Sequence, residues 1–273
     1  MKNKSMESQM ATKRNVSYWH VLKTLIKSEF KVFLNKAADV LIDTGLWILV
    51  SVFVSGYIIT GHGMPANYLL IAISGLVASA GLMQAYSGIF NLVSDISGDR
   101  TISYSLTLPM PSWLVVLNMI VSLSLSAMFC SSIALPVALG LLAYRGELAL
   151  VAPFKLLIAF VLGNIFWATF SIFMTSITDG PFQIRKVWMR IMFPMWFLGG
   201  YGFSWMALSK IAPTFAYFAL ANPFLYVFES IRCAMLGQEG YLPFWISSGL
   251  LFMFIVMFAL ISIRNLRRRL DFV

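Results

Sequence analysis

The sequence predicts an all-α integral membrane protein with six transmembrane helices. Hydrophobic residues make up 59% of the 273 residues and charged residues only 11%. An ordinary soluble domain has about 25% charged residues. Several apolar runs reach the roughly 20 residues that a helix needs to cross a hydrocarbon core of about 30 Å. Alternating segments of about ten residues, which a transmembrane β-barrel requires, do not recur, so helices are expected to form the whole membrane domain.

Residues 1–36 are expected to form a cytoplasmic N-terminal segment with an interfacial amphipathic helix at 16–34. Apolar residues recur on one face of this helix, and Lys23, Lys27 and Lys31 follow one another on the other. A helix of this kind lies among the lipid headgroups with its lysines towards anionic lipid. The less favoured alternative is a cytosolic helix packed on another domain. Residues 1–36 contain no apolar core region and no small-residue cleavage site, so no removable signal peptide is expected.

Residues 37–273 form the predicted transmembrane domain. The six spans are placed at about 41–60, 68–93, 113–143, 154–177, 189–208 and 243–263. The second span is rich in Gly, Ala and Ser, which let neighbouring helix backbones approach closely. The third span is too long for one straight crossing, and Pro136 and Gly140 are expected to break or kink its far end.

The stretch 211–237 is long enough to count as a seventh span, but we interpret it as an external re-entrant or surface-lying helical pair before the last span. Asn222-Pro223 interrupts it, because proline disfavours helix at its own position and at the preceding residue. A crossing would also bury Glu229 and Arg232, which is expensive in a membrane. These two residues are expected to form a structural ion pair on one helix rather than a substrate contact.

The distribution of basic residues predicts the orientation in the membrane. With six spans, sixteen of the twenty Lys and Arg residues lie on the N-terminal side. Positive charge accumulates in cytoplasmic loops, so both termini are predicted in the cytoplasm and the protein in the cell inner membrane. The formal net charge of +9 is spread over segment ends instead of one soluble patch, and no nucleic-acid partner is expected.

The residues expected for membrane catalysis or ion coupling are missing from the sequence. The predicted spans contain almost no ionisable residue, whereas ion-coupled transporters need buried carboxylates or histidines as relays. There is no His/Glu metal cluster and no Gly-x-Ser-x-Gly turn, so neither a metal site nor a catalytic site is expected. A phosphate loop with Gly-Lys-Ser/Thr is also missing, so ATP would have to be hydrolysed by another polypeptide.

A polar passage, residues 94–113, separates the second and third spans. Asp99 and Thr101 can cap a short helix over about 100–107, with Leu106 available to seat in the cleft of a partner. Prolines follow and end this helix. The passage fits either a cytoplasmic coupling helix pushed by a soluble motor or a plain connecting loop.

Three passages resemble the type-2 membrane subunits of ATP-binding-cassette (ABC) exporters, the family of polysaccharide, nodulation-factor and drug export permeases. The family has an acidic/basic-Gly-Thr-x-x-x-Leu-x-x-x-Pro passage after span two; residues 97–111 read SGDRTISYSLTLPMP. Its Asn-Pro-Leu-Thr-Tyr-like passage before the last span is similar to NPFLYVFESIRCAMLG at 222–237, and its Pro-x-x-Phe-x-x-Gly segment to FPMWFLGG at 193–200. One departure is that Asp99-Arg100 stands between the glycine and the threonine.

The resemblance implies a permease subunit that moves a lipid-like, glycan or amphiphilic drug substrate out across the inner membrane. It implies a homodimer, or a pair with a similar permease, that binds two copies of a cytosolic ABC ATPase, with ATP and Mg held by the ATPase. The positions it assigns to contact with the ATPase are Asp95, Asp99, Arg100, Thr101, Tyr104 and Leu106. Those it assigns to the external re-entrant helices are Asn222, Pro223, Glu229 and Arg232.

The second and fifth spans are the candidates for the translocation path, the second for its small residues and the fifth for its aromatic ones. The candidate path residues are Gly75, Ser79, Phe193, Trp196 and Tyr201. Aromatic rings stack on sugars or hold amphiphiles, although a lipid-facing belt is the alternative use for most of them. The alternative function is a self-contained membrane channel or scaffold/assembly protein without an ATPase partner.

Overall fold

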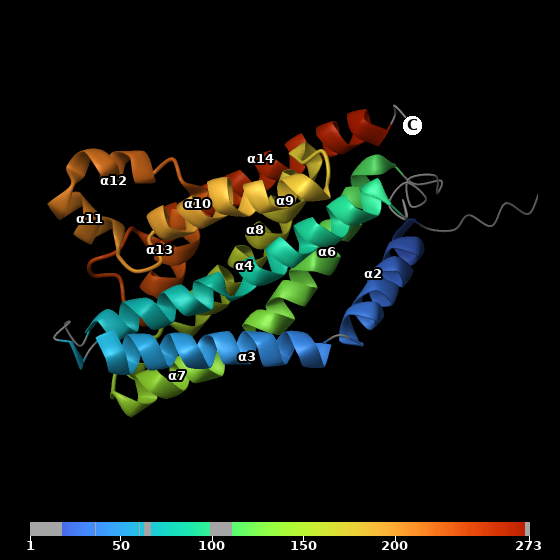
Figure 1. Cartoon of the computed structure of the whole chain (residues 1–273). Coiled ribbons are helices and arrows are strands. Elements are labelled where there is room, and N and C mark those ends of the chain that lie inside the picture. The colour runs from blue at the N-terminus through green and yellow to red at the C-terminus, as the bar shows by residue number, and fades with distance from the viewer. Residues whose placement is uncertain (1–17, 36, 60, 63–66, 99–110, 271–273) are drawn as a thin grey trace, which may run out of the picture.

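The computed structural model describes residues 18–35, 37–59, 61–62, 67–98 and 111–270. These residues form a bundle of helices, and none of them belongs to a strand (Figure 1). The predicted all-α class is confirmed for this part of the chain.

Five helical segments in the described ranges are long and apolar enough to cross a membrane, which makes the chain a multi-pass membrane protein by length and composition. They are Ala37–Ile59, Tyr68–Ser97, Trp113–Tyr144, Pro153–Ile177 and Phe244–Arg268. The helices that form them are α3 (Ala37–Phe53) with the π-helix η1 (Val54–Ile59), α4 (Asn67–Ser97), α6 (Ser112–Ser131) with α7 (Ala134–Tyr144), α8 (Pro153–Ile177) and α14 (Phe244–Leu270). Each of the five overlaps one of the six predicted spans.

The third span is interrupted close to the predicted place. Helix α6 ends at Ser131 and α7 begins at Ala134. Pro136 lies just beyond this break; it has no N–H to donate to the Ser132 carbonyl, and its ring crowds that carbonyl. Gly140 lies inside α7 and breaks nothing.

The bounds predicted for the fifth span, 189–208, are wrong. The helical run there is α9 (Pro181–Val187), the π-helix η3 (Trp188–Met192) and α10 (Phe193–Leu198). Gly199 and Gly200 end it, because Gly200 has φ +94°, a left-handed conformation that favours glycine. The run is about 27 Å long at 1.5 Å per residue, close to the hydrocarbon thickness of about 30 Å. It is not among the five apolar segments, and the count of six spans stays a prediction.

Three short helices, not two, lie between this run and the last span: α11 (Trp205–Ile211), α12 (Pro213–Ala219) and α13 (Pro223–Leu236). The predicted break at Asn222-Pro223 is present, and the Asn222 side chain caps α13 by accepting a hydrogen bond from the Phe224 N–H at 3.0 Å. Helix α12 is largely exposed, but every residue of α13 from Pro223 to Met235 is buried. A surface-lying position is therefore wrong for α13.

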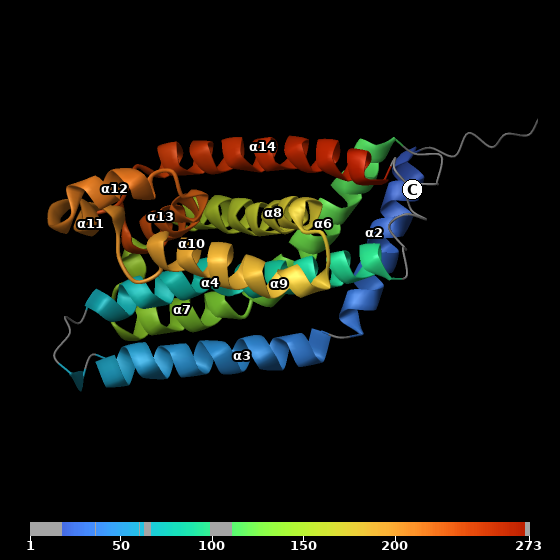
Figure 2. The ribbon, with the colours of Figure 1, turned by 45° about the horizontal axis from the view of Figure 1, so that its top comes forward.

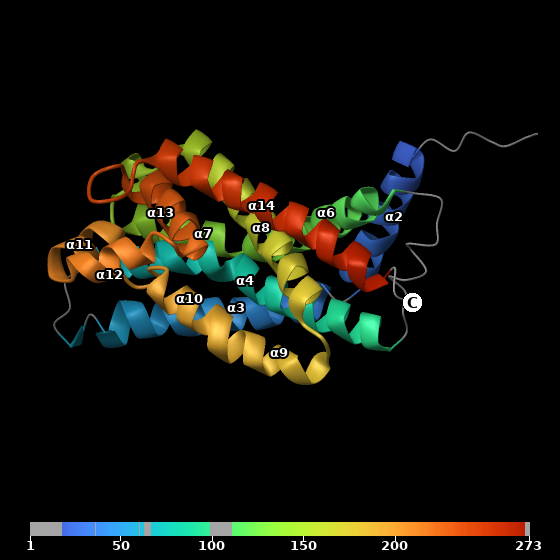
Figure 3. The ribbon, with the colours of Figure 1, turned by 90° about the horizontal axis from the view of Figure 1, so that it is seen from above.

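Helix α8 is the centre of the bundle, with α4, α6, α13 and α14 packed around it (Figure 2). Seen from above, α9 and α10 run beside α4 (Figure 3). Helices α11 and α12 lie at the end of the bundle opposite to α2 (Tyr18–Leu34) and to the C-terminal part of α14 (Figure 1). Helix α3 lies along one face of the bundle (Figure 2). It is loosely attached, since only 11% of the residues in the most apolar 18-residue stretch of Ala37–Ile59 are buried, compared with 78% for Tyr68–Ser97.

The amphipathic helix α2 begins and ends close to its predicted bounds. Lys23, Lys27 and Lys31 are exposed, as expected. Part of its apolar face packs on α6, where the Phe33 ring meets Phe129 edge-on at 5.7 Å between centroids. The helix is thus held by the bundle at the same time as it presents its lysines outward.

The small residues of α4 serve close packing. A Cβ added at Gly81 would lie 2.6 Å from both the Asn164 side-chain oxygen and the Trp167 ring of α8. The Trp167 indole N–H donates to the Ala78 carbonyl at 2.9 Å, and the Ser171 hydroxyl donates to the Ala85 carbonyl at 2.9 Å. Helix α8 therefore lies against the backbone of α4, as expected for small residues in a membrane bundle.

The predicted orientation can be tested with single cysteines at two exposed positions at opposite ends of the bundle, His62→Cys and Arg268→Cys. A membrane-impermeant maleimide should label the first in intact cells and the second only after permeabilisation. The native Cys130 and Cys233 are buried, so the unmodified chain serves as the low background. Labelling of both positions from one side, or the reverse pattern, would refute the six-span orientation.

Candidate functional site

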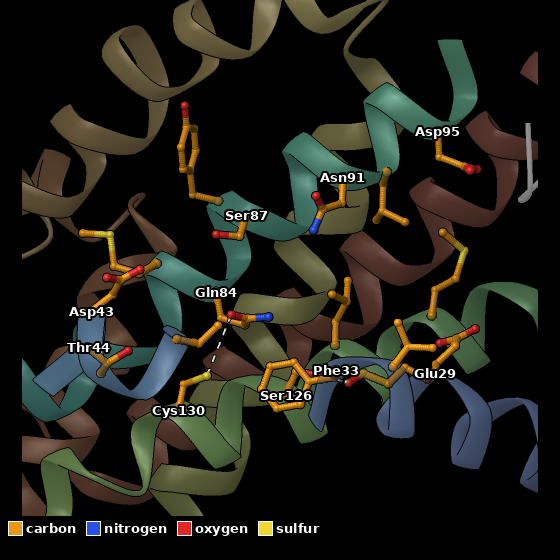
Figure 4. Close-up of a pocket in the computed structure, with 18 of the residues that line it drawn as sticks. Glu29, Phe33, Asp43, Thr44, Gln84, Ser87, Asn91, Asp95, Ser126 and Cys130 are labelled. Carbon is orange, nitrogen blue, oxygen red and sulfur yellow. Dashed lines mark hydrogen bonds between the residues drawn. The ribbon is translucent and has the colours of Figure 1, made fainter. Parts of the chain in front are cut away.

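A cavity of about 810 Å³ lies between α2, α3, α4 and α6 (Figure 4). Its walls come from α2, the first half of α3, the second half of α4 and most of α6. These parts all lie towards the end of the bundle that carries α2 and the C-terminal part of α14 (Figure 1). Its volume is in the range of sites for drug-sized molecules, roughly 300–1,000 Å³.

Helix α4 contributes a stripe of polar side chains to the cavity: Gln84, Ser87, Asn91 and Asp95. They are spaced by three or four residues, so they lie on one face of the helix. Figure 4 shows them following one another along α4. This face is polar in a helix that is mostly apolar.

Helix α6 contributes a second polar stripe to the cavity: Asn118, Ser122, Ser126 and Cys130. Its members are four residues apart, which again places them on one face. At one end the stripes meet, where the Cys130 thiol donates to the Gln84 side-chain oxygen at 3.8 Å (Figure 4). At the other, the Asn118 side-chain amide donates to Glu29 Oε1 of α2 at 2.7 Å.

Helices α2 and α3 add carboxylates and aromatic rings to the wall. Glu29 and Phe33 come from α2, and Asp43, Thr44 and Trp47 come from α3. Asp43 lies inside the first apolar segment rather than at its edge. The cavity thus combines carboxylates, uncharged polar groups and apolar surface.

A second polar centre, the Glu229–Arg232 pair of α13, holds the segment that follows α10. The two side chains are fully buried and form the predicted ion pair, with 3.8 Å between Arg232 Nη1 and Glu229 Oε1. The guanidinium donates to the carbonyls of Tyr201 and Phe203 at 2.7 Å each. One buried charge is thereby paired and also hydrogen-bonded.

The Glu229 carboxylate is satisfied in the same way. It accepts hydrogen bonds from the backbone N–H groups of Trp205 at 2.9 Å and Leu242 at 2.8 Å. Burial raises the pKa of the carboxyl, whereas Arg232 and these two N–H groups lower it. Through its hydrogen bonds to Tyr201, Phe203, Trp205 and Leu242, the pair ties α13 to the segments before and after it in the chain.

The five candidate path residues lie together but outside the cavity wall. Trp196 Nε1 of α10 donates to Ser79 Oγ of α4 at 2.8 Å, and its ring lies 4.4 Å from the Tyr201 ring between centroids. A Cβ on Gly75 would collide with the Tyr201 carbonyl oxygen, and Phe193 packs on Trp196. Together they form a tight contact between α4 and the end of α10.

The predicted coupling residues fall almost wholly outside the described residues. Asp99, Arg100, Thr101, Tyr104 and Leu106 belong to 99–110, of which the structure gives no description. Asp95 is described, and it lines the cavity near the end of α4. Of the predicted re-entrant residues, Asn222 joins α13 to α10 by donating to the Met195 carbonyl at 2.7 Å.

Apart from Asp95, which the sequence assigned to contact with the ATPase, the cavity residues were not predicted from the sequence. The available signal was the helical spacing of polar residues in two neighbouring spans, 84-87-91-95 and 118-122-126-130. Isolated serines and amides in a membrane helix usually bond within the helix or to a neighbour, which hid this signal. Only the packing of α4 beside α6 makes one site of them.

In comparisons with known proteins, no family model matches the chain and no curated protein matches it. Among the described residues, no three His, Cys, Asp or Glu side chains are close enough to hold a metal ion. The fold and the site define the class as a multi-pass helical membrane protein with a polar cavity inside its bundle.

Proposed function

We propose that this chain is the permease subunit of an ATP-binding-cassette exporter in the cell inner membrane, with both termini in the cytoplasm. It acts as a homodimer, or with a similar permease, and is driven by two copies of a cytosolic ATPase that hold ATP and Mg. The exported substrate enters the polar cavity between α2, α3, α4 and α6. The type-2 motifs of the sequence and the placement of this cavity support the proposal.

The observation that carries the proposal is the relation of the cavity to the connection between α4 and α6. Both helices supply a polar stripe to the cavity. The connection between them contains the predicted coupling residues, among them Asp99 and Arg100. A force applied to this connection is applied directly to two walls of the cavity. A soluble ATPase that presses there would change the shape of the cavity without any catalytic group in this chain.

The loose attachment of α3 agrees with such a mechanism. Helix α3 forms a third wall and is mostly exposed, with large apolar side chains such as Leu46, Leu49 and Phe53 outside the bundle. Segments with few buried contacts open at low free-energy cost. Movement of α3 relative to α4 would open the cavity sideways, and its exposed face offers a surface to a second permease subunit.

The experiment that tests the proposal is affinity purification of the full chain through a tag after Val273, followed by identification of any ATPase that accompanies it. A stoichiometric phosphate-loop ATPase is expected. The double variant Asp99→Ala/Arg100→Ala should lower transport by about tenfold, within the 5- to 150-fold range of typical coupling between sites. Insertion into the membrane should be unchanged.

The matched control is Arg145→Ala/Glu147→Ala, which removes one basic and one acidic residue from the connection between α7 and α8 at the opposite end of the bundle. It should retain both the ATPase and transport. Purification without an ATPase, repeated after crosslinking, would reject the exporter and favour the self-contained channel or scaffold. Normal transport by the Asp99/Arg100 variant would reject the coupling role of this connection.

A further inference from the structure

The charged residues in the lining of the cavity between α2, α3, α4 and α6 are all acidic, although the chain as a whole is basic. The lining contains three carboxylates, Glu29, Asp43 and Asp95. The lining residues that the structure describes include no Lys, Arg or His, although the chain has a formal net charge of +9. A cavity with low-dielectric walls and charges of one sign concentrates ligands of the opposite sign.

The α6 side of the cavity holds polar atoms that lack a partner among the described residues. Asn118 is 4% exposed and Ser122 is 8% exposed, and both residues line the cavity. Asn118 Oδ1 and Ser122 Oγ make no hydrogen bond within the described part of the chain. Buried polar atoms normally have a partner, and here the missing partner of Asn118 Oδ1 is a hydrogen-bond donor.

The rest of the wall is apolar and partly aromatic. Phe33, Trp47 and Tyr86 contribute rings, and Met83 and Leu123 contribute flexible or branched aliphatic surface. Aromatic faces attract organic cations, and ligand sites combine such surfaces with a few well-placed polar groups. The three observations point to one class of ligand.

We propose that this cavity binds an amphiphilic organic cation, a molecule with a positively charged head and an apolar body. Asp43 and Glu29 attract the charge, the rings hold the apolar body, and the polar stripe of α6 accepts hydrogen bonds from those cations that carry N–H groups. This inference rests on the proposed function in one respect: such a cation is the exported substrate only if the chain is an exporter. Binding itself requires only this chain.

The test is equilibrium dialysis of the full chain in phosphatidylcholine nanodiscs against tetraphenylphosphonium, with tetraphenylborate as an anion of the same shape. Empty nanodiscs give the lipid background. The cation should bind saturably, with one site for each chain, and the anion should show no saturable binding. Asp43→Asn and Glu29→Gln should each weaken the binding of the cation about tenfold, equivalent to about 1.4 kcal/mol.

The matched control is Asp39→Asn, which makes the same change on the same helix; Asp39 and Asp43 are both exposed, but only Asp43 lines the cavity. Its affinity should equal that of the unmodified chain. Ser87→Lys adds a positive charge to the wall at an exposed position, where the fold tolerates a longer side chain, and should abolish binding of the cation.

Each of three results would overturn the inference. The first is equal saturable binding of both ions, and the second is an equal loss of affinity for the cation in Asp39→Asn and Asp43→Asn. The third is the lack of saturable binding of the cation by a monodisperse chain. These results are independent of the exporter itself, because no ATPase is present in the assay. A co-purifying ATPase without cation binding refutes only the ligand class. Cation binding without an ATPase refutes only the exporter.

Discussion

Replacing Arg232 with methionine should lower the free energy of unfolding by about 3–5 kcal/mol, the usual cost of leaving one member of a buried ion pair without its partner. The Glu229 carboxylate would stay buried without a counter-charge. The carbonyls of Tyr201 and Phe203 would also lose their hydrogen bonds to the guanidinium. Unfolding in mixed micelles with increasing SDS, followed by far-UV circular dichroism, measures the change.

The control for this prediction is Arg190→Met, which makes the same substitution at an exposed arginine. It should change stability by less than about 0.5 kcal/mol, as surface substitutions usually do. The double variant Glu229→Gln/Arg232→Met should regain part of the loss, because it removes the unpaired charge. Equal stability of Arg232→Met and the unmodified chain would contradict a clamping role for the pair.

Trp167→Ala should also cost about 3–5 kcal/mol, the range measured when large aromatic residues are removed from a core. Trp167 is 1% exposed, and its ring lies 4.6 Å from that of Phe224 between centroids. The variant loses the hydrogen bond to the Ala78 carbonyl and the close contact with Gly81. Helices within lipid are held together mainly by packing, so a cavity at this contact weakens the association of α4 with α8. The same SDS titration measures the loss.

Trp245→Ala is the corresponding control, because Trp245 of α14 is 63% exposed. It should leave stability nearly unchanged. If both tryptophan variants lose the same stability, Trp167 does not define the α4–α8 contact. If only Trp167→Ala is destabilised, the packing of α8 on α4 at Trp167 contributes to the stability of the bundle.

The bundle thus has two regions of different character. Around α8 it is densely packed, and the buried Glu229–Arg232 ion pair holds the neighbouring segments to α13. Around the cavity it is polar, and one wall, α3, is held by few contacts. This division agrees with the proposed exporter, which would need a firm core beside a site with movable walls.

The positions of most spans could be predicted because they depend on local properties. A membrane helix must satisfy its own backbone hydrogen bonds and be apolar over about 20 residues, and both conditions can be read from consecutive residues. The interruption before Pro136 and the break at Asn222-Pro223 follow from the geometry of proline alone. Lys23, Lys27 and Lys31 are exposed because they share the polar face of α2.

The predicted fifth span, 189–208, runs across Gly199-Gly200, whereas the helix ends there. Composition does not distinguish a glycine that lets helices approach from a glycine that ends a helix. The difference lies in φ, which is +94° at Gly200, and in the packing of α13 against Gly199, where a Cβ would lie 2.9 Å from the Phe224 Cβ. That packing involves a segment more than twenty residues away in the sequence.

Burial of Glu229 and Arg232 was judged too costly from the sequence, and the tertiary structure shows why the cost is met. Each charge finds two backbone partners, supplied by the segments around Tyr201–Trp205 and Leu242, in addition to the other charge. By itself the sequence determined the helical membrane class, most of the spans and this ion pair, because these depend on residues adjacent in the chain or on one helix. The tertiary structure decided the buried position of α13 and the polar cavity, because both arise where side chains of different helices meet.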